Sequence, residues 1–127
     1  MKTSILSCFL LLMVGLVFFS CEQDTKKKLE GTWTMIEIPS KGYEENWEFT
    51  DSKIIITHTN PGDTAVPFKS GTYSIKNSTV TTDGDGMGSS GVEYYRGNFE
   101  IRSLDGTELI LLRKDIGLQY YEFEKKQ

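Results

Sequence analysis

From Leu29 onward the chain alternates short runs of β-branched and aromatic residues with turn residues, and no stretch follows the 3.6-residue period of an amphipathic helix. Val, Ile, Thr, Tyr, Phe and Trp suit a pleated sheet, whereas Gly, Pro, Asn and Asp interrupt it. The pattern predicts eight strands, at Thr32–Ile38, Asn46–Thr50, Lys53–Thr59, Phe68–Ile75, Thr79–Thr82, Val92–Ser103, Glu108–Arg113 and Leu118–Lys125. The expected fold class is all-β.

The connections between these strands are short and carry tight-turn residues such as Asp51-Ser52, Asn77-Ser78 and Asp105-Gly106. Tight turns join neighbouring antiparallel strands, so we expect an up-and-down meander. A meander of eight strands hides its edges best by closing into a barrel, whose interior is filled by side chains or holds one small ligand. A two-sheet sandwich usually needs longer crossover connections than this sequence has.

The N-terminus has the pattern of a secretory signal. Lys2 supplies a positive charge, and Ile5–Phe19 contains no charged residue. This stretch has the length of a signal core and falls short of the roughly 20 apolar residues that span a bilayer. We therefore expect residues 1–20 to be a signal peptide helix. Residues 21–28 are polar and lack apolar periodicity, which predicts a flexible tether before a folded domain at residues 29–127.

Ser20-Cys21 ends the apolar run and resembles the lipobox of bacterial lipoproteins, in which the cysteine thiol takes a diacylglycerol group. The resemblance implies lipidation at Cys21, palmitate among the acyl chains, and a membrane as a partner through that lipid. An ordinary secretory signal cleaved elsewhere is the alternative. Because Cys8 leaves with the signal and Cys21 is expected to carry lipid, no thiol remains for a disulfide, a zinc site or a nucleophile.

The net charge of the mature chain limits the classes of partner that it could bind. Residues 1–20 contain one basic residue, Lys2, and no acidic residue, so 13 basic and 18 acidic residues remain and the net charge is near −5. Phosphate binding requires clustered Lys and Arg, and the only local basic run is residues 26–28. Nucleic acid is therefore not an expected partner.

Several segments in order resemble the small lipocalin-like domains of Gram-negative lipoproteins. They are Gly31-Thr32-Trp33, Trp47–Thr50, Ser70–Ile75, Phe99–Leu111 and Tyr120–Phe123. The resemblance implies a ligand-binding barrel in the cell envelope, anchored to the outer membrane on its periplasmic or surface face. Two features depart from lipocalins proper: Asp105-Gly106-Thr107 does not match their Thr-Asp-Tyr motif, and Lys125 or Lys126 stands where they place an arginine over the tryptophan.

No catalytic or metal-binding constellation is visible, so we expect a protein that is not an enzyme and has no cofactor or metal. His58 is the only histidine and is expected at an edge or the mouth of the barrel. Asp83–Gly88 superficially resembles a calcium loop, but Met87 occupies its third ligand position, and position 12 is Tyr94. A loop without calcium is expected there.

Aromatic residues are the remaining candidates for function. Most should fill the barrel: Trp33, Trp47, Phe49, Tyr73, Tyr95, Phe99, Tyr121 and Phe123 suit inward positions. If a cavity is open, the Asn60–Pro67 and Asp83–Gly91 loops should frame it at the end opposite Trp33, and candidate ligand-binding residues are Phe68, Tyr73, Tyr95 and Phe99.

Two functions remain open for this expected monomer. The first is a lipid-anchored, lipocalin-like binding protein for a small apolar or amphipathic ligand. The second is a protein-interaction module with a filled barrel, such as an accessory subunit or an inhibitor of an envelope protein. An interior cavity would favour the first, and an exposed apolar patch would favour the second.

Overall fold

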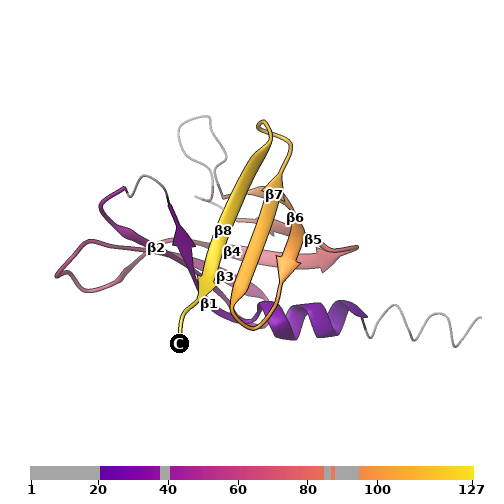
Figure 1. Ribbon diagram of the computed structural model, residues 1–127, viewed down its shortest axis with the longest axis horizontal. Helices are drawn as coiled ribbons and strands as arrows, with labels where there is room; N and C mark the ends of the chain where they lie inside the picture. Colours follow the sequence, from indigo (N-terminus) through magenta and orange to yellow (C-terminus); the bar gives the residue numbers. More distant parts are fainter. Residues whose placement is uncertain (1–20, 38–40, 85–86, 88–94) are drawn as a thin grey trace, which may run out of the picture.

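The computed structural model describes residues 21–37, 41–84, 87 and 95–127. In this part of the chain eight antiparallel strands close into a barrel (Figure 1). Each strand pairs with the next, and β8 pairs back with β1. The strands are β1 (Gly31–Ile36), β2 (Glu44–Phe49), β3 (Lys53–Thr59), β4 (Val66–Lys76), β5 (Thr79–Asp83), β6 (Gly97–Leu104), β7 (Glu108–Arg113) and β8 (Gln119–Lys125). The predicted eight-stranded meander is confirmed.

The largest difference in strand bounds is at β6, which the sequence predicts to begin at Val92. The strand begins at Gly97, and residues 95 and 96 form a bend. Residues 92–94 lie outside the described part. Gly97 has a φ of 148°, which favours glycine, and a Cβ there would lie 2.8 Å from Nη2 of Arg113. The chain therefore turns at Gly97 before it enters the sheet.

A β-bulge interrupts the pairing of β3 with β4. Ile56 pairs with Lys69 and Thr57 pairs with Pro67, so Phe68 is the extra residue on β4. A bulge accommodates a proline, which has no N–H to give to the ladder, and it re-aims the side chain of the extra residue. Phe68 is consequently half exposed.

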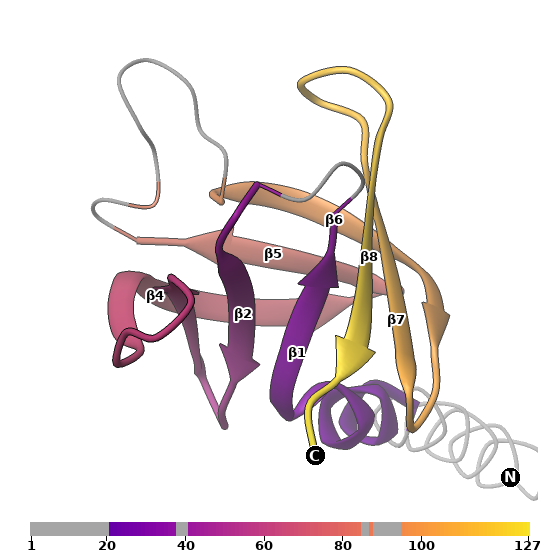
Figure 2. The same cartoon turned by 60° about the vertical axis from the view of Figure 1, so that its left-hand side comes forward.

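Residues 21–29 form a helix, whereas the sequence predicts a flexible tether over residues 21–28. The helix lies across one end of the barrel, beside the C-terminus (Figure 2). Charge pairs support it: Lys28 lies 3.1 Å from Asp24 one turn earlier, and Lys26 lies 3.1 Å from Asp51 of the barrel. Leu29 at its end is fully buried. Such a helix buries one apolar residue, so it leaves no apolar period in the sequence. Within the described part, no helix has the length and apolarity required to span a bilayer.

Trp33 lies at the end of the barrel that the helix covers. Its side chain is fully buried, and its Nε1–H donates a 2.7 Å hydrogen bond to the carbonyl of Leu29. Nζ of Lys125 sits 4.4 Å from the centroid of the Trp33 ring, and Trp33 pairs with Lys125 across β1 and β8. The expectation that Trp33 is buried beside the last strand is confirmed.

The centre of the barrel is filled by the indole of Trp47. Its ring centroid lies between 5.0 and 6.4 Å from the ring centroids of Phe49, Tyr95, Phe99, Tyr121 and Phe123. Tilted and edge-to-face contacts of this kind stabilise an aromatic core beyond their buried area. The interior is therefore packed at its middle, in agreement with the prediction that aromatic side chains mostly fill it.

Candidate functional site

Glu45 is a buried carboxyl group at the end of the barrel opposite Trp33. Its residue is 3% exposed. Because side chains two apart on a strand share a face, Glu45 points inward with Trp47, and the indole Nε1–H of Trp47 donates to Oε1 at 2.7 Å. This contact satisfies one of the two carboxylate oxygens.

The second oxygen of Glu45 meets His58 and Tyr95. His58 is the cross-strand partner of Glu45, and its Nε2 lies 2.8 Å from Oε2. The hydroxyl of Tyr95 donates to the same oxygen at 3.2 Å and lies 3.3 Å from His58 Nε2. Three side chains from separate segments thus converge on one carboxylate, which satisfies a group that would be costly to bury alone.

Burial raises the pKa of the Tyr95 phenol, and the negative charge of Glu45 and its hydrogen bond raise it further, with smaller contributions from Tyr43 and Glu37. Tyr95 therefore stays protonated at physiological pH. Its hydroxyl acts as a hydrogen-bond donor toward Glu45 rather than as a base.

Aromatic rings flank His58 on both sides. Phe68 is stacked on the imidazole, with centroids 4.2 Å apart and an interplanar angle of 15°, and the ring of Tyr43 lies 4.5 Å away. Phe68 also meets the edge of Tyr95 at 6.2 Å. The bulge on β4 gives Phe68 this position. We call Tyr43, Glu45, His58, Phe68 and Tyr95 the mouth cluster.

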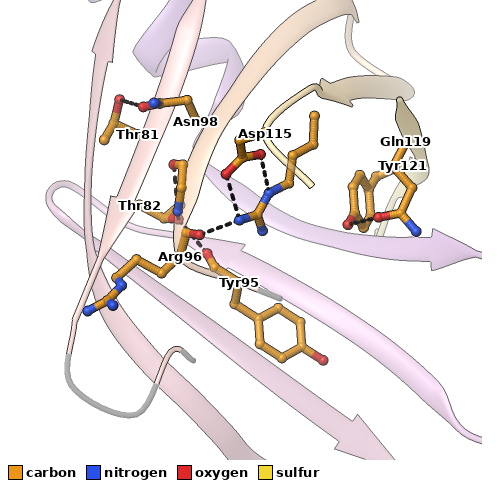
Figure 3. A network of polar contacts seen from close by, with 10 residues as sticks. Thr81, Thr82, Tyr95, Arg96, Asn98, Asp115, Gln119 and Tyr121 are labelled. Carbon is orange, nitrogen blue, oxygen red and sulfur yellow. Dashed lines mark hydrogen bonds and ion pairs between the residues drawn. The ribbon is translucent and has the colours of Figure 1, made fainter. Parts of the chain in front are cut away.

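An ion pair holds the segment that carries Tyr95 (Figure 3). Arg113 is 1% exposed, and its Nε and Nη2 donate to the two carboxylate oxygens of Asp115 at 2.6 and 2.9 Å. Nη2 also donates to the carbonyl of Arg96 at 2.7 Å, and the hydroxyl of Thr82 donates to the carbonyl of Tyr95. These bonds fix residues 95 and 96, so the Tyr95 ring is directed away from them and toward Glu45.

Of the predicted ligand-binding residues, the structure brings Phe68 and Tyr95 together. Phe99 is fully buried beneath them, against Trp47 and Arg113. Tyr73 lies at the other end, where its hydroxyl donates to the carbonyl of Thr50. Even-numbered strands run from the mouth toward the base, and Tyr73 comes late in β4. This order explains why Tyr73 does not join the others.

Glu45 and Tyr43 are members of the mouth cluster that the sequence analysis does not identify. A signal for Glu45 exists, because the alternation that turns Trp47 and Phe49 inward also turns Glu45 inward. His58 lies at the mouth, as expected. Among the described residues, no group of three or more His, Cys, Asp and Glu side chains could hold a metal ion. Most of the Asp83–Gly91 loop lies outside that part, but Met87 is described and is fully buried.

A surface groove of about 520 Å³ runs beside the mouth cluster. Tyr43 belongs to both. The other lining residues come from the segment before β2, from the start of β2, from the end of β3 and from the loop after β3: Gly42, Glu44, Thr59, Asn60, Pro61, Gly62 and Asp63. The predicted frame at Asn60–Pro67 therefore does border the open end. The geometry offers aromatic faces, one buried carboxylate and an adjoining groove.

The arrangement of one chain in an eight-stranded, up-and-down barrel with a helix over its base defines a lipocalin-like architecture. A lipocalin-like protein from Bacteroides uniformis has a similar structure, with a TM-score of 0.54 and 13% identity over 79% of this chain and 99% of that one. A protein from Bacteroides eggerthii is similar, with a TM-score of 0.54 and 16% identity over 77% and 99% of the two chains. No protein-family model matches this chain. No curated protein matches it either. The chain has a lipocalin-like fold.

Proposed function

We propose that this chain is a lipid-anchored envelope protein that binds a small apolar or amphipathic ligand at the mouth of its barrel, without catalysing a reaction. The observation that carries the proposal is the mouth cluster, in which Phe68, a residue that is 50% exposed, and Tyr43 pack against His58, whose Nε2 contacts the buried carboxylate of Glu45. Exposed aromatic faces beside a few convergent polar groups are typical of ligand sites.

Because Trp47 fills the middle of the barrel, the ligand would bind near the rim. The adjoining groove has a volume within the range of small-molecule sites, roughly 300–1,000 Å³. An apolar body would lie in the groove against Tyr43, and a polar head would reach toward His58 and Tyr95. Because aromatic side chains pack around Trp47 in the described part of the chain, the groove limits the size of the ligand that we propose.

The anchor follows from the sequence. Cys21 is exposed, with a free thiol, at the first described residue of the helix. Lipid on Cys21 would tie the helix and the base of the barrel to the outer membrane. The mouth would then face away from that membrane, toward the periplasm or the exterior.

Titration with an apolar fluorescent probe tests the binding proposal. The full chain in lipid nanodiscs should bind about one probe per barrel above the background of empty discs. Phe68→Ala should weaken binding by about tenfold, because it removes the exposed aromatic face (~1.4 kcal/mol per factor of ten). Tyr120→Ala is the matched control, because Tyr120 is an aromatic of similar exposure on β8, outside the mouth cluster. Equal probe binding by Phe68→Ala and wild type would overturn the proposal.

A protein-interaction module is the second candidate. Ile116, Leu118 and Tyr120 are exposed in and after the β7–β8 connection, Leu118 to 72%. Apolar side chains gathered in this way are common at protein-binding surfaces. If the Tyr120→Ala control, rather than Phe68→Ala, abolished a function measured in the host cell, this second candidate would be preferred.

A further inference from the structure

Exposed apolar side chains lie on the outside of the barrel where β1, β8 and β7 run side by side (Figure 2). Successive residues of a strand point to opposite faces of the sheet. Phe123 of β8 and Met35 of β1 pack in or against the core, so Tyr120 and Ile36 point outward. Tyr120 is 55% exposed and Ile36 is 41% exposed. This outer surface is therefore apolar toward the mouth, where β8 begins and β1 ends.

Three glutamates continue the same surface toward the base. Glu122 and Glu124 follow Tyr120 at alternate positions of β8, and Glu108 of β7 is the cross-strand partner of Glu124. All three are exposed, and with Ile36 they line a groove of about 350 Å³. Like charges directly opposite each other on a sheet are destabilising. We call Ile36, Glu108, Tyr120, Glu122 and Glu124 the β8 face.

The two lysines that follow Glu124 in sequence have other partners. Nζ of Lys125 donates to the carbonyl of Glu30. Burial lowers the pKa of Lys125, and the acidic charge that opposes this shift is that of Glu30 rather than a glutamate of the β8 face. Nζ of Lys126 lies 2.6 Å from a carboxylate oxygen of Glu44. Neither lysine therefore pairs with the β8 face.

Two further cations, Arg102 and Lys114, are paired on the neighbouring strand. Both contact Glu100 of β6, at 2.7 and 2.9 Å. The carboxylate of Glu108 accepts a hydrogen bond from the hydroxyl of Ser103, which carries no charge. Within the part of the chain that the structure describes, no ion pair reaches the three glutamates of the β8 face. The β8 face thus joins an apolar end to an acidic end that lacks a cation.

We infer that the β8 face is a docking surface for an extended segment of another protein, in which basic residues at alternate positions follow an apolar residue. Glu122 and Glu124 lie two residues apart on one strand, about 7 Å, which is also the spacing of alternate residues in an extended partner. Opposite charges across an interface select the partner. A second copy of this chain would place glutamates against glutamates, and an anionic lipid surface would be repelled in the same way. This inference goes beyond the proposed function, because the β8 face lies outside the barrel and does not require a ligand at the mouth.

Three labelled peptides test the inference by fluorescence anisotropy on the full chain in nanodiscs of zwitterionic lipid, with empty discs as the blank. The peptides share an apolar end and differ at two alternate positions: Trp-Ser-Lys-Ser-Lys-Ser, Trp-Ser-Gln-Ser-Gln-Ser and Trp-Ser-Glu-Ser-Glu-Ser. At low ionic strength we expect the lysine peptide to bind about tenfold more tightly than the glutamine peptide, and the glutamate peptide to bind most weakly. High salt should shrink this advantage, because it screens exposed charges. No binding of the lysine peptide, or equal binding of the three, would overturn the inference.

Tyr120→Ala tests the apolar end of the β8 face. It should weaken the binding of the lysine and glutamine peptides by a similar factor, because it removes a contact that both share. Unchanged binding of both peptides would contradict the role of Tyr120 and overturn the inference as stated. A wild-type protein that sediments as a dimer, and a Tyr120→Ala variant that sediments as a monomer, would assign the surface to a second copy instead.

The double variant Glu122→Gln/Glu124→Gln assigns the preference to its source. It should abolish the advantage of the lysine peptide over the glutamine peptide. Glu22→Gln/Glu48→Gln is the matched control, because it removes the same net charge from exposed positions on the helix and on β2, and it should keep the advantage. The first double variant relieves the repulsion with Glu108, so we expect it to unfold at a denaturant concentration no lower than that of wild type. An equal loss of the advantage in both double variants would show that net charge, rather than the β8 face, attracts the peptide, and would overturn the inference.

Discussion

At the scale of single residues, the base of the barrel depends on Gly31, Trp33 and Lys125. Gly31 has a φ of 121°, and a Cβ there would lie 2.5 Å from Nζ of Lys125. Its missing side chain therefore lets the lysine cross to the Trp33 ring and donate to the carbonyl of Glu30. Burial lowers the pKa of Lys125, as expected for an ammonium group that loses part of its hydration when it packs over an indole ring.

Trp33→Ala should lower the free energy of unfolding by ~3–5 kcal/mol, because it empties the base of the barrel. Such a loss is a large share of the stability of a small domain. Urea denaturation followed by circular dichroism measures it. Tyr120→Ala, a truncation of an exposed aromatic, should stay close to wild type. A Trp33→Ala variant with an unchanged midpoint would show that Trp33 contributes little to the core.

The raised pKa of Tyr73 predicts that the protein loses stability in alkaline solution. Burial, and to a lesser degree the charges of Glu30 and Asp51, raise its pKa to about 12. An unfolded tyrosine has a pKa of about 10. Between these two values the unfolded chain has released this proton and the folded chain retains it, so stability falls as the pH rises. Below pH ~10 both states are protonated, and Tyr73 adds no pH dependence.

Denaturant midpoints measured across this alkaline window test the prediction. Tyr73→Phe should flatten the decline, although it also removes the hydrogen bond to the carbonyl of Thr50 and so lowers stability at every pH. The relevant quantity is therefore the slope of stability against pH, not the stability at any one pH. Burial also raises the pKa of Tyr95 and Tyr121, so part of the slope remains in the variant. An identical slope in both proteins would contradict the assignment to Tyr73.

At the scale of elements, the sequence predicts best where turn chemistry is strong. The bounds of β3 and β7 agree with the prediction, because Asp51-Ser52, Asn60-Pro61 and Asp105-Gly106 flank them. The sequence predicts least well where contacts between residues far apart in the chain determine the local structure. Residues 95 and 96 have strand-like neighbours, yet Arg113 and Thr82 hold their carbonyls outside the sheet. The sequence alone identifies Phe68 and Tyr95 as candidate aromatic residues at the rim. It does not predict that three side chains converge on Glu45, because that depends on the register in which the strands pair.

The helix at residues 21–29 illustrates the same limit and yields a prediction. Leu29 is its fully buried residue, and the Leu29 carbonyl accepts the Trp33 hydrogen bond. Leu29→Ala should cost ~2–5 kcal/mol of stability and should release the helix from the barrel. Hydrogen exchange should then accelerate at the amides of residues 22–28 more than in β3. Lys27→Ala, on an exposed position of the same helix, is the control and should leave exchange unchanged in the helix as well as in β3. Slow exchange in the helix of Leu29→Ala would contradict this role.

At the scale of the whole molecule, the two ends of the barrel differ in structure. The base has the helix, Trp33 and the turns after β2, β4 and β6. The mouth has the connections after β1, β3 and β7 and the mouth cluster. The structure thus separates the proposed point of attachment from the proposed point of binding by the length of the strands. Changes at either end should leave the other undisturbed.

Attachment is tested by Cys21→Ala, which should move the protein out of the membrane fraction or leave it unprocessed. Each buried methylene of an acyl chain contributes ~0.8 kcal/mol to membrane binding, so two or more chains hold the protein stably. Metabolic labelling with a fatty-acid probe measures the modification directly. Cys8→Ala, the only other cysteine change the chain allows, is the control and should keep the label. A labelled Cys21→Ala protein would contradict lipidation at Cys21.

The pairing of β1 with β8 has a consequence for how the chain folds. In every other pair the partners adjoin in sequence, whereas Lys125 reaches back 95 positions to Glu30. When the chain emerges from the ribosome N-terminus first, β1 appears early and keeps an open edge until β8 follows. Local hairpins can form quickly, but the final ladder must meet the loop-closure entropy of nearly the entire domain. We therefore expect the closure of the seam between β1 and β8 to limit the folding rate, and we expect β1 to be open to pairing with a foreign strand until then.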